Sequence, residues 1–93
     1  MNNKLVIHKK HLYVQKEYTE IEASENSFNV IYVEEQNGLP TVWYETVENP
    51  ITKSKIKIAV VGTGHEVPEK SFHIGSCKCG AFVWHVYQLK ERK

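Results

Sequence analysis

The residues best suited to chemistry stand where an apolar run ends, in the segment Val60-Val61-Gly62-Thr63-Gly64-His65. Glycines on both sides of a threonine permit a tight turn and let backbone N–H groups come close to another molecule. Backbone donors, a hydroxyl and an imidazole together suit a phosphate or another anionic group. The segment is no Walker loop, because it lacks the Gly-Lys-Ser/Thr ending. The alternative is a structural turn in which His65 caps a loop carbonyl.

Aromatic side chains and a second histidine form another candidate group. Neighbouring residues of a strand face opposite sides, so Trp84 and His85 cannot both point into a core. An exposed tryptophan or tyrosine offers stacking area to a nucleobase or an anchor to a protein partner. For Trp43 the alternative is plain packing in the core beside Tyr32. The predicted ligand-binding residues are therefore Gly62, Thr63, Gly64, His65, Trp43, Tyr44, Trp84 and His85.

Four metal-ligating side chains also fall within one segment, with the spacing His73-x3-Cys77-x-Cys79-x5-His85. Structural zinc sites use paired Cys-x2-Cys, and two cysteines two apart on a strand do not easily chelate one ion. We therefore expect no metal, no cofactor and no disulfide. No serine stands in a nucleophile elbow, so no catalytic residue is predicted. Acid–base chemistry by two histidines and a threonine stays open as an alternative.

Strands must position these residues, and the clearest strand signal is Asn37-Gly38 between two β-rich runs. This pair is typical of a two-residue type I′ hairpin turn. The register that follows sets Val33 opposite Val42, Tyr32 opposite Trp43, and Ile31 opposite Tyr44.

The other strands are predicted from alternation and turn residues. Residues 55–61 begin with alternating polarity and end wholly apolar, as in a strand whose far end is buried. A last hairpin is expected about Lys78-Cys79-Gly80, with a central final strand. Shorter strands are expected at 4–7, 12–15 and 18–23, with a turn at 24–27. The sequence thus predicts an all-β fold, a small antiparallel sandwich or partly open barrel of about six to eight short strands.

Length and charge limit the classes of function. The 93 residues, with 41% apolar content, make one domain over 1–93 with flexible ends at 1–3 and 90–93. Twelve basic and eleven acidic residues give a formal charge of +1, which argues against nucleic-acid binding. No apolar run is long enough for a membrane span, and no secretory signal is evident. We therefore expect a cytoplasmic protein without a membrane partner.

Several motifs, taken in order, resemble a family of short phage-encoded β-rich proteins known as a domain of unknown function. The similarity extends from about Ile21 to Leu89, and Cys77-Lys78-Cys79 departs from the family pattern. It implies a phage or prophage origin, expression inside a bacterial host and no assigned enzymatic activity. The motifs are Gln36-Asn37-Gly38, Val42-Trp43-Tyr44, Val61-Gly62-Thr63-Gly64-His65 with Pro68 following, Ile74-Gly75 and Phe82-Val83-Trp84-His85-Val86.

Three functions follow as hypotheses. The first is a non-enzymatic phage accessory protein, a homo-oligomer that sequesters a small anionic, nucleotide-like ligand and so counters host defence. A small sandwich has little interior room, so a pocket for such a ligand would form where two copies meet. The second is an inhibitor or adaptor that blocks a host defence enzyme through exposed aromatics and a sheet edge. The third is a hydrolase acting on a nucleotide.

Overall fold

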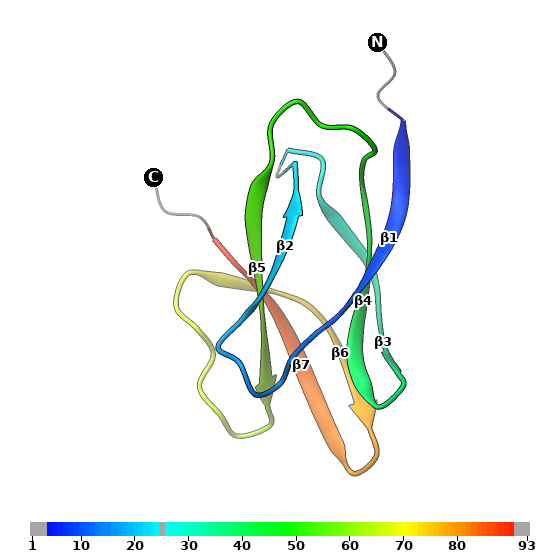
Figure 1. Ribbon diagram of the computed structural model, residues 1–93. Helices are drawn as coiled ribbons and strands as arrows, with labels where there is room; N and C mark the ends of the chain where they lie inside the picture. Colours follow the sequence, from blue (N-terminus) through cyan, green and yellow to red (C-terminus); the bar gives the residue numbers. More distant parts are fainter. Residues whose placement is uncertain (1–3, 25, 91–93) are drawn as a thin grey trace.

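The computed structural model describes residues 4–24 and 26–90, so the ends at 1–3 and 91–93 lie outside the described residues. Within these ranges the chain forms seven strands and no helix (Figure 1), and thus no helix able to cross a membrane. The strands are β1 (Leu5–His11), β2 (Thr19–Ala23), β3 (Asn29–Gln36), β4 (Leu39–Val47), β5 (Ser54–Gly62), β6 (Ser71–Cys79) and β7 (Phe82–Leu89).

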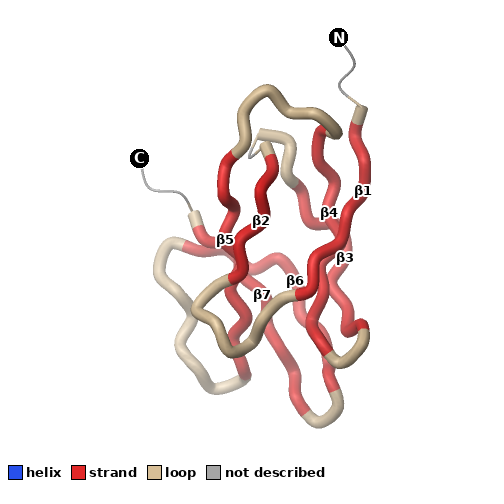
Figure 2. Tube along the Cα trace, in the orientation of Figure 1, coloured by secondary structure: helices blue, strands red, loops and turns tan. Residues whose placement is uncertain are grey.

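Two antiparallel sheets pack face to face (Figure 2). The first sheet has the order β1-β4-β3 and the second has the order β2-β5-β7-β6. Alternate residues of each strand point into the space between the sheets, where Leu12, Val42, Ile58 and Val86 are fully buried. The all-β prediction is confirmed, and the architecture is a sandwich rather than a closed barrel.

The hairpin of β3 and β4 has the turn that the sequence predicts. Asn37 and Gly38 take φ values of 56° and 82°, and a type I′ turn needs positive φ at both positions. The pairs Val33 with Val42 and Tyr32 with Trp43 are confirmed. The pair Ile31 with Tyr44 is wrong, because a bulge between Val30 and Tyr32 sets Val30 opposite Tyr44.

The first strand is longer than expected and the strand predicted at 12–15 is absent. β1 pairs with β4 until His11 lies opposite Thr41, and then the Leu12 amide donates to the Pro40 carbonyl at 2.8 Å. Leu12 is fully buried, so the chain leaves the sheet there to enter the core. The Tyr13 amide donates to Thr19 Oγ1 at 3.0 Å, which closes the loop that leads to β2.

The last strand, β7, lies between β5 and β6, as its apolar character predicts. Its turn is displaced from the predicted position, because Cys79 still pairs with Phe82 and the positive φ of 61° falls on Gly80. β5 and β6 both run antiparallel to β7 and therefore run in the same direction. The loop 63–70 must return along the sheet, as its yellow-green trace does in Figure 1.

That loop lies over the outer face of the second sheet. Ala59 and Val61 point away from the core, yet they are only 3% and 8% exposed. Pro68 and Lys70 from the loop line one cleft together with Lys57 of β5. The loop thus covers the outer face of β5 and leaves the outer face of β6 and β7 open.

A bulge in β6 lies where this strand packs closely against β3 of the other sheet. The register with β7 shifts between His73 and Gly75. A Cβ at Gly75 would overlap the side chain of Val33 on β3, with 2.9 Å to its Cβ. Only glycine therefore fits here, and the bulge turns His73 and Ser76, three positions apart, to the same face of β6.

We predict that Gly75→Ala lowers the free energy of unfolding by about 1–3 kcal/mol, because the added methyl overpacks the contact with Val33. Urea denaturation measures the change. Gly75→Ala should cost less in a Val33→Ala background, where the side chain it meets is shorter. An equal cost in both backgrounds would contradict the steric explanation.

Candidate functional site

Four polar side chains form one hydrogen-bonded line, here called the polar row, on the outer face of the second sheet. Thr63 Oγ1 lies 3.0 Å from His85 Nε2. The other ring nitrogen, His85 Nδ1, lies 3.0 Å from Ser76 Oγ. Ser76 Oγ in turn lies 2.9 Å from His73 Nε2. Two imidazoles and two hydroxyls thus share one chain of contacts that is open to solvent.

Three neighbouring strands position the polar row. Thr63 follows the last residue of β5, His85 lies on β7, and Ser76 is its direct partner on β6. His73 joins them through the β6 bulge and packs against the ring of Tyr87 at a centroid distance of 5.2 Å. Thr63 and His85 were predicted from the sequence as ligand-binding residues. His73 was weighed only as a metal ligand, and Ser76 was not predicted. Strict alternation places positions 73 and 76 on opposite faces, so only knowledge of the bulge would have joined them.

The turn beside the polar row faces outward. The His65 amide donates to the Gly62 carbonyl at 3.1 Å, and Gly64 has the positive φ, 92°, that a type II turn needs at its third residue. Thr63, Gly64 and His65 are exposed. Among the hydrogen bonds of the described residues, none uses the amide of Thr63 or Gly64. The turn therefore offers two backbone donors to solvent.

Trp84 lies on the other side of the sheet from its neighbour His85. A Cβ at Gly62 would stand 3.3 Å from the Trp84 ring and 3.6 Å from His65 Nδ1. Trp84 also stacks on Phe82, with centroids 5.7 Å apart. The tryptophan therefore supports the turn from the inner side, whereas His85 belongs to the polar row.

Trp43 and Tyr44 lie in other parts of the molecule. Trp43 forms the expected cross-strand aromatic pair with Tyr32, at a centroid distance of 5.4 Å. The pair faces outward from the first sheet and not into the core, and Trp43 is half-buried. Tyr44 points into the core between His8 and Phe28, at 5.9 and 5.0 Å between ring centroids. The structure thus separates both residues from the turn at Gly62–His65.

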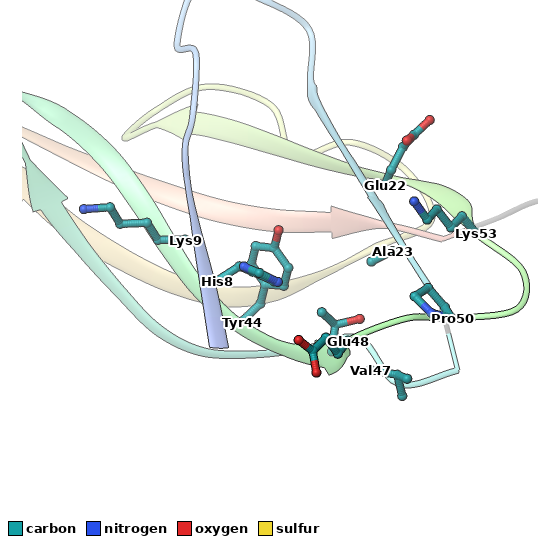
Figure 3. A pocket seen from close by; sticks show the side chains of 10 residues that line it. His8, Lys9, Glu22, Ala23, Tyr44, Val47, Glu48, Pro50 and Lys53 are labelled. Carbon is teal, nitrogen blue, oxygen red and sulfur yellow. The ribbon is translucent and has the colours of Figure 1, made fainter. Parts of the chain in front are cut away.

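Tyr44 also borders a cleft of about 290 Å³ at the opposite end of β5 (Figure 3). Glu22 and Lys53 bring charges of both signs to its edge, and His8 also lines it. Burial raises the pKa of the Tyr44 hydroxyl, so this group stays protonated at neutral pH. The cleft lies roughly 26 Å from the Gly62 turn, at 3.3 Å for each residue along β5.

A larger cleft, of about 550 Å³, shares the outer face of the second sheet with the polar row. Lys57, Lys70 and Lys90 line it together with the acidic side chains of Glu17 and Glu69. We call it the lysine cleft. Leu89, which also lines it, is four residues from His85 on the same face of β7, or about 13 Å away. Cations and the polar row therefore lie within the span of one small molecule.

The two cysteines lie on the opposite face of β6 from the histidines. Cys77 pairs with Trp84 and is buried, whereas His73 and His85 face outward. The four side chains cannot surround one ion. Burial raises the pKa of the Cys77 thiol to about 12, and the nearby Cys79 thiol adds to this shift. Both cysteines are free, and Cys77 is protonated near neutral pH.

Fold and site together define a small two-sheet β-sandwich whose second sheet carries a solvent-open row of hydroxyls and imidazoles. The chain belongs to the family described as a domain of unknown function, DUF7352, which matches residues 3–93. This match includes most of the N-terminal segment, which the motifs alone did not relate to any family. Comparisons with curated proteins and with solved structures gave no match.

We predict that stability decreases as the pH rises above about 9. The fold raises the pKa of the Cys77 thiol from its ordinary value of 9.0 to about 12, so ionisation above pH 9 favours the unfolded chain. Urea midpoints between pH 7 and pH 11 measure the loss. Cys77→Ala should show a smaller decrease over this range, and equal decreases in both proteins would exclude the thiol as a cause.

Proposed function

We propose that this protein binds and sequesters a small anionic, nucleotide-like ligand on the outer face of its second sheet. The observation that carries the proposal is the polar row, because its four side chains are already aligned, with Thr63, His73 and Ser76 exposed and His85 half-buried. Imidazole N–H and hydroxyl groups donate hydrogen bonds to phosphate oxygens, and imidazoles become cationic as the pH falls. The free amides of the Gly62–His65 turn add backbone donors of the kind found in anion-binding nests.

Charge and an aromatic ring nearby support a ligand larger than free phosphate. Lys57, Lys70 and Lys90 place three positive charges in the lysine cleft, against the two carboxylates of Glu17 and Glu69. Tyr87 is half-buried between the lysine cleft and the polar row, on the same face of β7. In our proposal Tyr87 offers its ring to a base, a role for which the sequence had suggested Trp84, Trp43 or Tyr44.

The biological setting of the proposal rests on the resemblance to phage-encoded proteins. A phage accessory protein would act in the cytoplasm of the infected bacterium, where nucleotide-derived signals activate defence. Sequestering such a signal requires tight binding and no turnover. The proposed role is therefore a counter-defence sponge that acts without catalysis.

We propose separately that the protein self-associates on the side of the sandwich opposite the polar row, so that this interface leaves the polar row open to solvent. The outer face of the first sheet gives this proposal a surface, which we call the apolar face: Leu5, Ile7, Tyr32 and Trp43. Leu5 and Ile7 are 59% exposed and Tyr32 is 55% exposed. The charged residues Lys9 and Glu45 lie among these side chains on the same face. Exposed apolar side chains grouped on one face are typical of interaction sites.

We predict that the protein retains a nucleotide-like ligand through heating and filtration. Incubation with cyclic dinucleotides or cyclic ADP-ribose variants should return the intact compound from the denatured protein, more of it at pH 6 than at pH 8. His85→Ala should weaken retention at least about tenfold, since it breaks the polar row at its centre. His65→Ala tests the contribution of the turn.

His8→Ala is the matched control, because His8 is an exposed histidine on the first sheet, outside this site. Equal retention by His85→Ala and the wild type would remove the polar row from the binding site. Recovery of altered products would favour the hydrolase alternative instead. No retention of any compound would contradict the sponge and leave the protein-binding alternative.

An inhibitor or adaptor of a host enzyme is the second candidate, and the apolar face favours it. Sedimentation of the purified protein distinguishes self-association from a surface kept for another partner. We predict a wild-type oligomer that Ile7→Glu dissociates by burying a charge in the interface. Ile51→Glu is the control, since Ile51 is 90% exposed in a loop. A wild-type monomer would contradict self-association and favour the adaptor.

A further inference from the structure

We propose that Ser76 is a nucleophile that captures the phosphoryl group of a reactive phosphate ester or anhydride held at the polar row. This inference goes beyond ligand retention because it adds a covalent step at the same site. It depends on how protons are distributed along the polar row, and on the two bases that stand beside one serine.

Ser76 has an imidazole on each side. Its Oγ lies 2.9 Å from His73 Nε2 and 3.0 Å from His85 Nδ1. A neutral imidazole has one N–H and one acceptor nitrogen, so a complete chain of hydrogen bonds can run in only two directions. In one direction His85 donates to Thr63 and accepts from Ser76. In the other, Thr63 donates to His85, His85 to Ser76, and Ser76 to His73.

In both directions of the hydrogen-bond chain, the Ser76 hydroxyl donates its proton to an imidazole nitrogen. In either complete chain the serine is therefore paired with a base. Thr63 holds the ring of His85 from its other nitrogen at 3.0 Å, so the base is also oriented by a third group. A nucleophile, a base and an orienting group within hydrogen-bond reach are the arrangement that activates serine.

Ser71 lies on the same face of β6 as Ser76, but its hydroxyl has no imidazole partner. Its hydroxyl donates to the Pro68 carbonyl at 2.6 Å and so stabilises the end of the loop. A carbonyl cannot take up the proton, so Ser71 has a structural partner and no base. The contrast between the two serines makes Ser71 a matched control for Ser76.

The chemical step balances within the site. Ser76 Oγ attacks phosphorus, the Oγ–P bond forms, and the bond from phosphorus to the leaving oxygen breaks. The hydroxyl proton passes to His85 Nδ1 or His73 Nε2. The leaving oxygen departs as an anion or takes a proton from the other imidazole when that ring is protonated.

A fluorophosphonate ester tests the inference, because it transfers its phosphonyl group to activated serines and releases fluoride. We expect one adduct by intact mass, located at Ser76 by peptide mapping, with a rate that falls from pH 8 to pH 5.5 as the imidazoles take up protons. His85→Gln should slow labelling by about 100-fold or more. Thr63→Val, which keeps the side-chain shape, should slow it by a smaller factor.

Ser71→Ala should be labelled at the wild-type rate, and Ser76→Ala should not be labelled. A wild-type protein without an adduct, an adduct on other residues, or a rate independent of pH would overturn the proposal. Mapping on the wild type decides the matter even if a variant fails to fold. Ligand retention should strengthen as the pH falls while labelling weakens, so failure of this inference is distinguishable from failure of the proposed function.

Discussion

The close approach of β6 to β3 is the constraint on which the site depends. At Gly75 the backbone of one sheet meets the Val33 side chain of the other, with no space for a Cβ. The strand bulges there, and the bulge turns His73 toward the face that already carries Ser76. A packing requirement in the interior thus decides which polar side chains meet on the surface.

The fold was largely readable from local sequence signals. Asn37-Gly38 specifies its turn because both residues tolerate positive φ, and the hairpin register follows from the turn type. The apolar β7 was correctly expected in the centre of a sheet. Prediction failed where a long-range contact overrides alternation. The strand expected at 12–15 is absent because Leu12 enters the core, and the bulge at Ile31 shifts the register with Tyr44.

The site was readable only in part, for the same physical reason. Glycines at the end of an apolar strand identified the turn that carries Thr63, and His85 was notable as an imidazole in an apolar strand. Nothing in the sequence marked Ser76 as a site residue, because its place in the polar row comes from its register with His85 and from the nearby bulge. Trp43 and Tyr44 were grouped with the turn on residue type alone, and distance in the fold separates them from it.

The order of strands in the second sheet also determines when that sheet can form. β7 follows β5 and β6 along the chain and lies between them in the sheet, where β5 and β6 do not pair with each other. During synthesis the ribosome must therefore release this strand before the earlier two can join. The pairing of β5 with β7 is non-local, so the edge of β5 stays unpaired until β7 has emerged.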